Sequence, residues 1–513
     1  MKVDTGWLRQ QVISHHKLIV VLLLLAVLLQ CILSMRMKSA TYDEPNHLIA
    51  GYYYLKMGDL SLNWPNPPLI NVISAIPLLF LDLKTQPYDP HQSDHLFVHD
   101  FLYVINNNAD QIVFWARIPT ILLSLLLGFF AFKWATELYG IESGLFSLLL
   151  YAFSPNILAH SRLATIDLGV TCFTFIACYR LWKFGSRPSA GNLLLAGLTL
   201  GLALISKFSA VFLLPVYLLF PLAQLFLNDS QPRPNLGLGR PDLRTDAPTG
   251  SLKKCGQMIV YSGLIIGIGL LVIIAAYPSY LKLWYHFDET IALAVQQSYP
   301  KAEINKGLWH LVSSIRIPGR EYALGLVGLI EHSKKGHDAF LWGKISPQGW
   351  WYYHLAALAI KTPIALQIML LLALGLSLWW LIKGTGPNLH DDFFLVIPPF
   401  VILMAISFGS VKIGLRHVLP VFPFIFVFTA RFFKLALERS LLSGLAFLLI
   451  IWYLISSIRI YPHYLAYFNE YVGGPTNGYK YLVDSNLDWG QDLKGSKEYM
   501  ERRDIEKVKL AYF

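Results

Sequence analysis

Long apolar segments recur along this chain, and polar stretches separate them. The first, residues 18–33, follows Arg9, His15, His16 and Lys17 and has no small-residue cleavage site after it, so it predicts an uncleaved membrane span rather than a signal peptide. Further segments of about 20 residues have the length of membrane-crossing helices. They lie at 112–133, 143–160, 165–182, 191–206, 208–227, 257–277, 363–382, 393–410, 416–433 and 441–458. The pattern predicts an all-α polytopic membrane protein with about 11 transmembrane helices.

Three longer polar stretches, 35–111, 279–362 and 459–513, fall on one side of the predicted membrane. Within the first, the short apolar patterns at 46–57 and 68–81 predict interfacial helices, which lie on the membrane rather than cross it. We therefore expect residues 1–458 to form a transmembrane domain with outer loops 35–111 and 279–362. Residues 459–513 are expected to form a small outer segment that belongs to a larger, incompletely represented outer domain.

The distribution of lysine and arginine orients the spans. These residues are concentrated in the short segments at the end that holds the N-terminus, and they are sparse in the short segments at the opposite end. Because cytoplasmic loops carry the excess of positive charge, this asymmetry predicts a cytoplasmic N-terminus.

Composition excludes several classes of protein. Residues are 55% hydrophobic and 14% charged, whereas soluble proteins have about 25% charged residues. The net charge of +10 is explained by basic loops beside an anionic leaflet. No soluble segment combines a basic stripe with aromatic residues, so no nucleic-acid partner is predicted. The four cysteines have no C-x-x-C spacing, which supports neither a zinc site nor a disulfide framework.

An acidic pair, Asp43 and Glu44, follows the first span. Pro45 suits a first helical position, so Glu44 is predicted to cap a helix, with Asp43 just before it. One interpretation is simple capping, because the helix dipole favours an acid there. The other is a carboxylate pair at the membrane surface in which one acid is a general base toward an incoming hydroxyl. Adjacent residues do not share a helix face, so the two acids should have different tasks.

A third acid, Asp167, lies at the start of another span. It either caps that helix or pairs with Arg162, or it is functional, because an acid at membrane depth is costly to keep. Asp43 and Asp167 are also candidates to share a divalent cation, since hard cations take oxygen ligands.

Cations and histidines occur at the same ends of the spans, where the positive-inside rule does not explain them. Two interpretations stand: snorkelling toward lipid headgroups, or binding of anionic phosphate. The cations are Arg117, Arg162, Lys207, Lys361, Lys412 and Arg416. The histidines His160, His354 and His417 lack metal-ligand spacing, and we expect each to be a hydrogen-bonded interfacial residue.

Taken in order, these motifs resemble the GT-C glycosyltransferases, in particular family 39 with its protein O-mannosyltransferases and lipid A aminoarabinose transferases. The similar motifs are Asp43-Glu44-Pro45, Asn66-Pro67-Pro68-Leu69, Ala116-Arg117-Ile118-Pro119, Ala159-His160-Ser161-Arg162, Thr165-Ile166-Asp167, Ser206-Lys207-Phe208, Ile360-Lys361-Thr362-Pro363, Gly414-Leu415-Arg416-His417 and the run from Asp484 to Asp492.

The resemblance implies transfer of a hexosyl or pentosyl unit, with inversion, from a polyprenyl-phosphate sugar to a hydroxyl of a protein, a lipid or a glycan. It implies a multi-pass protein of the bacterial plasma membrane whose site faces the periplasm or exterior. By position, Asp43 is the implied general base, Glu44 its partner, and Asp167 a second acid that holds the acceptor or a metal. The implied ligands of the donor phosphate are Arg117, Lys207, Lys361 and Arg416.

A transporter or flippase of lipid-linked sugars is the alternative function. Transporters place ionisable residues near the bilayer midplane on broken helices, whereas here these residues lie at the ends of the spans. Residues 279–362 are too few for the large ligand-binding insert of the eukaryotic mannosyltransferases. The sequence therefore favours a transferase and leaves the sugar and the acceptor open.

Overall fold

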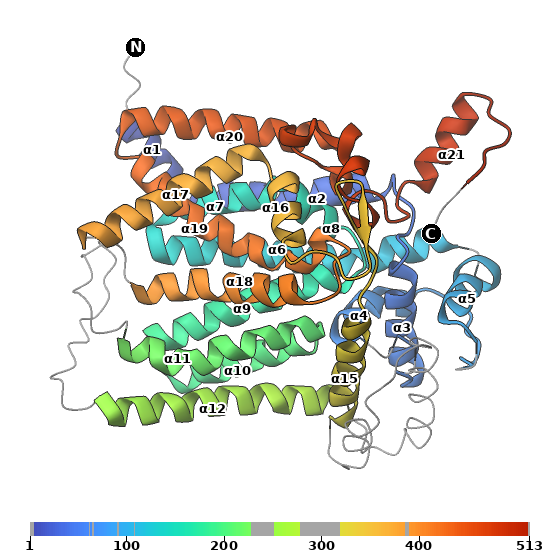
Figure 1. The fold of residues 1–513 in the computed structure, drawn as a ribbon, viewed down its shortest axis with the longest axis horizontal. Helices are drawn as coiled ribbons and strands as arrows, with labels where there is room; N and C mark the ends of the chain where they lie inside the picture. Colours follow the sequence, from blue (N-terminus) through green and yellow to red (C-terminus); the bar gives the residue numbers. More distant parts are fainter. Residues whose placement is uncertain are drawn as a thin grey trace.

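A bundle of helices, roughly aligned with one another, forms the body of the protein in the computed structural model (Figure 1). The structure describes residues 5–60, 62–63, 66–89, 92–106, 108–226, 251–277, 319–384 and 389–510. The longest helices are α2 (His16–Met35), α6 (Ala109–Tyr139), α9 (Ile166–Ser186), α12 (Ser251–Ala276), α17 (Ile364–Lys383), α18 (Leu389–Phe408) and α20 (Ser440–Ile460). The shorter helices of the bundle are α7 (Ile141–Ala152), α8 (Pro155–Ser161), α10 (Ala190–Leu204), α11 (Leu214–Phe226) and α19 (Val421–Ala436).

Seven helices in the described part of the chain are long and apolar enough to cross a membrane, or eight if the bent pair α7 and α8 counts as one. The chain is therefore an integral membrane protein. Every predicted span contains helix, but the predicted count of 11 is not confirmed. The physical reason is that α10 and α19 have only 15 and 16 residues, and α9 carries Asp167, Arg180 and Lys183.

The predicted span 143–160 is not one straight helix. The chain bends by 64° between α7 and α8, where Ser154 has an extended backbone and its side chain accepts a hydrogen bond from the backbone N–H of Ile157. Pro155 then begins α8 without losing a helical hydrogen bond, because its missing N–H lies in the first turn. The bend sets the course of residues 160–167, which carry several site residues.

Close packing of small residues holds neighbouring helices together in the bundle. A Cβ atom on Gly201 of α10 would lie 2.4 Å from the Cβ of Val272 on α12, so glycine is required at this contact. Small residues let helix backbones approach closely where lipid supplies no hydrophobic driving force between helices. Trp134 and Trp182 are buried in the aromatic centre of the bundle, with ring centroids 5.9 Å apart.

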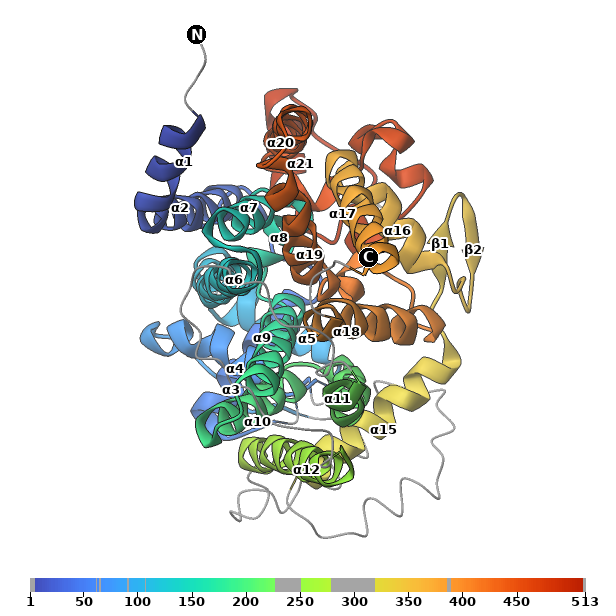
Figure 2. The same cartoon turned by 90° about the vertical axis from the view of Figure 1, so that its left-hand side faces the viewer.

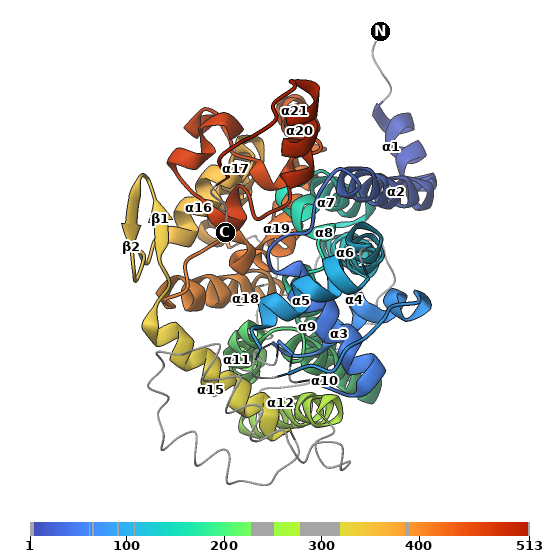
Figure 3. The ribbon, with the colours of Figure 1, turned by 90° about the vertical axis from the view of Figure 1, so that its right-hand side faces the viewer.

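One end of the bundle, which we call the site end, is covered by short elements (Figures 1 and 3). These are α3 (Glu44–Met57), α4 (Leu69–Ala75) with the 3-10 helix η1 (Ile76–Phe80), α5 (Asp94–His99) with the π-helix η2 (Asp100–Ile105), α15 (Arg320–Lys335), the antiparallel strands β1 (Ala339–Leu341) and β2 (Lys344–Ser346), and α21 (Leu493–Arg502). The predicted helices at 46–57 and 68–81 are confirmed as α3 and as α4 with η1. Of the predicted outer loop 279–362, residues 279–318 lie outside the described residues.

The opposite end faces the viewer in Figure 2 and holds α1 (Thr5–Ser14). An ion pair between α18 and α19 also lies at this end. Arg431 of α19 is buried and pairs with Asp392 of α18, and its guanidinium also donates to Tyr139 Oη at 2.9 Å. Charges at membrane depth are tolerated when they pair within the bundle. These contacts join α6, α18 and α19 at the end away from the candidate site.

Candidate active site at the site end of the bundle

Glu44 and Arg117 form a buried ion pair between α3 and α6. The guanidinium donates from Nε and Nη2 to the two carboxylate oxygens at 2.7 and 2.6 Å, and both side chains are almost fully buried. Glu44 also accepts hydrogen bonds from the backbone N–H groups of Thr41 and Ala164. Burial raises the pKa of Glu44, but Arg117 and these N–H groups lower it by more, so that the pKa lies below its usual range. Glu44 therefore stays charged.

Arg117 has no donor left for a ligand. Its Nη1 donates to the carbonyls of Met35 and Lys38, and its Nη2 donates to the carbonyl of Ser39 at 2.6 Å. With Glu44, it fixes the chain that leads from α2 into α3.

A second charge cluster joins Asp43, Asp167, Lys207 and Arg416. Arg416 Nη1 lies 2.7 Å from Asp43 Oδ2 and 3.9 Å from Asp167 Oδ2, and Lys207 Nζ donates to Asp167 Oδ1 at 2.6 Å. The side chain of Asp43 is 29% exposed, whereas that of Asp167 is 1% exposed. Asp43 is thus the accessible acid of the cluster, and Asp167 is a buried acid that holds two cations in place.

Asp43, rather than Glu44, is the N-cap residue of α3, so the predicted helix start was one residue late. Asp167 lies in the first turn of α9, but its partner is Lys207 rather than Arg162. Arg162 is buried with its guanidinium carbon 5.4 Å from the centre of the Tyr464 ring.

Two other cationic residues that the sequence singled out, Lys361 and Lys412, donate hydrogen bonds to backbone carbonyls. Lys361 Nζ donates to the carbonyls of Leu465 and Asn486, and burial lowers the pKa of Lys361 to about 7. Lys412 Nζ donates to the carbonyl of Gly409 at 2.6 Å. The contacts of Lys361 tie α16 (Tyr353–Lys361) to the C-terminal segment.

The histidines at this end differ from the prediction that each is hydrogen-bonded. Within the described residues, buried ring nitrogens of His160, His354 and His417 have no hydrogen-bond partner, and neither does Nε of Arg416. His417 also interacts electrostatically with Lys207, Arg416 and Asp167. A buried nitrogen without a hydrogen-bond partner destabilises the fold. Here such nitrogens lie near the positive charges of Lys207 and Arg416, so an anionic ligand would suit this place.

A chain of polar side chains leads from this cluster to a hollow. His47, one turn after Asp43, has Nδ1 3.0 Å from Asn71 Oδ1 and 3.1 Å from Asn63 Nδ2. Burial lowers the pKa of His47, so its imidazole is neutral. A small hollow lies between α3, α4, α15 and the end of α12, and the polar side chains lining it are Asn63, Asn66, Asn71, Tyr54, Tyr277 and Glu321.

The two acids of this cluster, Asp43 and Asp167, are too few to bind a divalent metal by themselves. Among the described residues, no group of three or more His, Cys, Asp and Glu side chains lies close enough to hold one. Asp43 and Asp167, the predicted metal ligands, instead share the guanidinium of Arg416. The pairing of these acids with Arg416 does not fit a metal site.

The chain is similar to one family of known proteins in sequence and to several solved structures in fold. Residues 97–232 match the family model of the dolichyl-phosphate-mannose-protein mannosyltransferases, which confirms the resemblance seen in the motifs. The Archaeoglobus fulgidus oligosaccharyltransferase, in its complex with zinc and sulfate, matches 96% of this chain with a TM-score of 0.50 and 12% identity. The protein has a GT-C fold.

Other solved GT-C structures are similar at lower scores. ArnT from Cupriavidus metallidurans, bound to undecaprenyl phosphate, matches 90% of this chain with a TM-score of 0.47 and 12% identity. The Saccharomyces cerevisiae Pmt1-Pmt2 complex, bound to its sugar donor, matches 52% of this chain with a TM-score of 0.37 and 14% identity. This chain spans 56%, 71% and 34% of the oligosaccharyltransferase, ArnT and Pmt chains, respectively. No curated protein matches it.

Within this GT-C fold, the structure brings four predicted residues together and separates the others. Asp43, Asp167, Lys207 and Arg416 form one cluster, whereas Glu44 with Arg117 and Lys361 lie in contacts of their own. Sequence reasoning missed Trp489 and His47. The four-residue spacing from Asp43 would have indicated His47, because such residues share a helix face. No local signal indicates that Trp489 meets Arg416.

Proposed function

We propose that this protein is a membrane glycosyltransferase that moves a sugar from a polyprenyl-phosphate donor to an acceptor hydroxyl. The observation that carries the proposal is the cluster of one accessible carboxylate, Asp43, beside Lys207 and Arg416. The match of residues 97–232 to a lipid-phosphate-mannose transferase family supports the same chemistry.

In the proposed reaction, Asp43 accepts the proton of the acceptor hydroxyl as its oxygen attacks the anomeric carbon. The bond from that carbon to the phosphate oxygen breaks, and the polyprenyl phosphate leaves with its electron pair. Lys207 and Arg416 stabilise the negative charge that develops on the phosphate. The partnerless nitrogens of His417 and Arg416 are suited to donate to the same group.

A single displacement, which inverts the anomeric carbon, follows from the unequal exposure of the acids. Glu44 is fully buried and Asp167 is nearly so, whereas 29% of the side chain of Asp43 is exposed. Asp43 is left as the one acid of this set that can reach a substrate. A double displacement would need a second accessible carboxylate as the nucleophile.

The hollow beside His47 is the proposed site of the transferred sugar. Its amide and tyrosine side chains provide donors and acceptors for sugar hydroxyls, and Asn71 links it through His47 to the helix that begins at Asp43. The bacterial plasma membrane that the resemblance implies is the proposed location, and the basic segments at the opposite end support a site that faces the periplasm or exterior. The acceptor is the hydroxyl of a protein, a lipid or a glycan.

Reconstitution tests this proposal against the flippase alternative. Purified protein in liposomes would receive radiolabelled undecaprenyl-phosphate sugars with native membrane extract as the acceptor source. We expect label to leave the lipid phosphate and enter an acceptor. Movement of intact lipid-linked sugar between leaflets, without transfer from any donor, would overturn the proposal.

Replacement of Lys207 by methionine should weaken donor binding. A charge-assisted hydrogen bond contributes about 1.5–3 kcal/mol, so KM for the polyprenyl-phosphate donor should rise roughly 10- to 100-fold. Lys207→Arg, which keeps the charge beside Asp167, should retain most of the binding. Lys84→Met, an exposed change at the same end, is the matched control. An unchanged KM in folded Lys207→Met would contradict the assignment of the phosphate site.

A further inference from the structure

The C-terminal segment pairs with the chain that leads to Asp43. The backbone N–H of Ser39 donates to the carbonyl of Gln491 at 2.9 Å, and that of Tyr42 donates to the carbonyl of Trp489 at 2.8 Å. The N–H of Lys494 also donates to Ser39 Oγ at 2.9 Å. Residues 39–42, which lie immediately before the N-cap of α3, are therefore bound to the backbone of Trp489 and Gln491.

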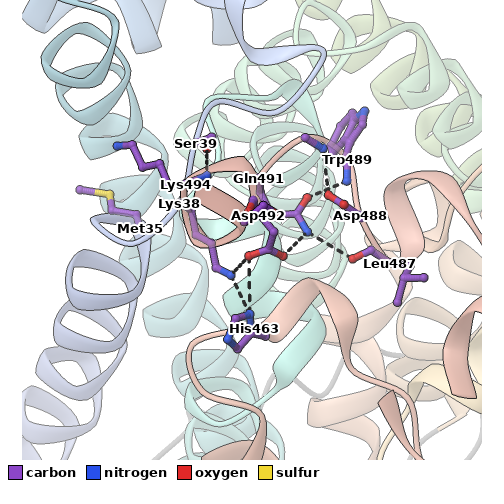
Figure 4. A network of polar contacts seen from close by, with 12 residues as sticks. Met35, Lys38, Ser39, His463, Leu487, Asp488, Trp489, Gln491, Asp492 and Lys494 are labelled. Atoms are coloured by element: carbon purple, nitrogen blue, oxygen red, sulfur yellow. Dashed lines mark hydrogen bonds and ion pairs between the residues drawn. The ribbon is translucent and has the colours of Figure 1, made fainter. Parts of the chain in front are cut away.

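A buried lysine reinforces this pairing (Figure 4). Lys38 has a side chain that is 2% exposed, and its Nζ contacts Asp492 Oδ1 and lies 2.8 Å from His463 Nδ1. Burial raises the pKa of Asp492, but hydrogen bonds with His463 and Lys38 lower it by more, to well below its usual range. Asp492 therefore remains a carboxylate against Lys38 at any pH at which the protein would function.

The same C-terminal segment holds the turn that carries Arg416. The backbone N–H of Leu415 donates to Asn486 Oδ1 at 2.8 Å, and Ser485 Oγ donates to the carbonyl of Ile413 at 3.2 Å. A Cβ atom on Gly414 would lie 2.3 Å from Ser485 Oγ, so the two segments are in close contact there. The Arg416 turn is thus fixed from the C-terminal side, just as residues 39–42 are.

Trp489 is the point where the two sets of contacts meet. Its side chain is buried, and the guanidinium carbon of Arg416 lies 4.0 Å from the centre of its ring. Asp43 and Arg416 are 373 positions apart in the sequence and lie on separate short elements, yet their charged groups are 2.7 Å apart. The carbonyl of Trp489 accepts a hydrogen bond from the backbone N–H of Tyr42, the neighbour of Asp43, and the indole ring of Trp489 lies against Arg416.

We propose that residues 484–492, the C-terminal clamp, set the position of Arg416 relative to Asp43, and that Trp489 is the positioning residue of the clamp. The ring attracts the guanidinium through its π face and keeps Nη1 directed at Asp43 and Asp167. This proposal rests on the proposed function only in its kinetic consequence, because the contacts themselves do not depend on a substrate.

Three variants of Trp489 separate positioning from simple packing. Trp489→Phe keeps an aromatic face under Arg416, Trp489→Leu keeps apolar bulk without one, and Trp489→Ala removes both. We expect kcat for sugar transfer to fall about 10- to 100-fold in Trp489→Leu and Trp489→Ala, because small misplacements of reacting groups have effects of this size. Trp489→Phe should stay within about fivefold of wild type. Tyr479→Leu, which alters an exposed aromatic residue of the same segment, is the control and should leave kcat unchanged.

Hydrogen–deuterium exchange of residues 39–43 and 411–418 tests the clamp without any substrate. Both segments should exchange faster in Trp489→Leu than in Trp489→Phe, at equal overall thermal stability. If the exchange pattern appears but wild type transfers no sugar, the proposed function fails and the clamp stands. If Trp489→Leu matches Trp489→Phe in exchange and in kcat per folded molecule, the clamp proposal is overturned.

Discussion

Asp43→Asn should reduce sugar transfer about 100- to 10,000-fold, the range that a general base contributes. The amide cannot accept the proton of the acceptor hydroxyl, yet it still offers an oxygen to Arg416 at the position of Asp43 Oδ2. The variant should therefore fold and should still bind undecaprenyl phosphate. Transfer from labelled donor in liposomes and binding of undecaprenyl phosphate are the two measurements.

The matched control for this prediction is Asp82→Asn. Asp82 is exposed in the same predicted outer loop and lies outside the described cluster, so the same chemical change there should leave transfer unaltered. Transfer by folded Asp43→Asn at the wild-type rate would remove the base assignment, and with it the single-displacement mechanism.

Glu44→Gln should destabilise the fold instead of acting on the chemical step. Removing one partner of a buried ion pair costs about 3–5 kcal/mol, because the other charge is left without compensation. Arg117 would keep its contacts to the carbonyls of Met35, Lys38 and Ser39 but lose its only carboxylate partner among the described residues. The free energy of unfolding in detergent measures the loss, and the double variant with Arg117→Met should recover part of it.

An exposed ion pair at the opposite end of the protein is the matched control. Arg9 and Glu142 are 2.5 Å apart, with 56% and 15% of their side chains exposed, and pairs near water contribute about 0–1 kcal/mol. Glu142→Gln should therefore change the free energy of unfolding by much less than Glu44→Gln. A stable Glu44→Gln protein with greatly reduced transfer would show instead that Glu44 acts in the reaction.

The two acids illustrate how adjacent residues obtain different environments. Asp43 lies at the N-cap position of α3 and remains partly exposed beside Arg416, whereas Glu44 is buried and enclosed by Arg117 and two backbone N–H groups. The sequence predicted that the tasks differ, because neighbours on a helix face different directions. Burial, which only the packed structure defines, decided which of the two acids is enclosed and which stays accessible.

The sequence alone determined the membrane-protein class, the helical segments, the short helices after the first span and the GT-C resemblance. These features depend on local apolar length and on motifs of adjacent residues, which the chain carries wherever it folds. It also restricted the candidate chemistry to a few charged residues at the ends of the spans.

Only the tertiary structure decided the partners of those residues. Asp167 meets Lys207 instead of Arg162, the amino group of Lys361 contacts backbone carbonyls, and Trp489 lies against Arg416. The physical reason is that the strength and the role of a charge depend on its burial and on its nearest partners. Partners separated by tens to hundreds of residues are set by how the helices pack, and no local pattern in the sequence records that packing.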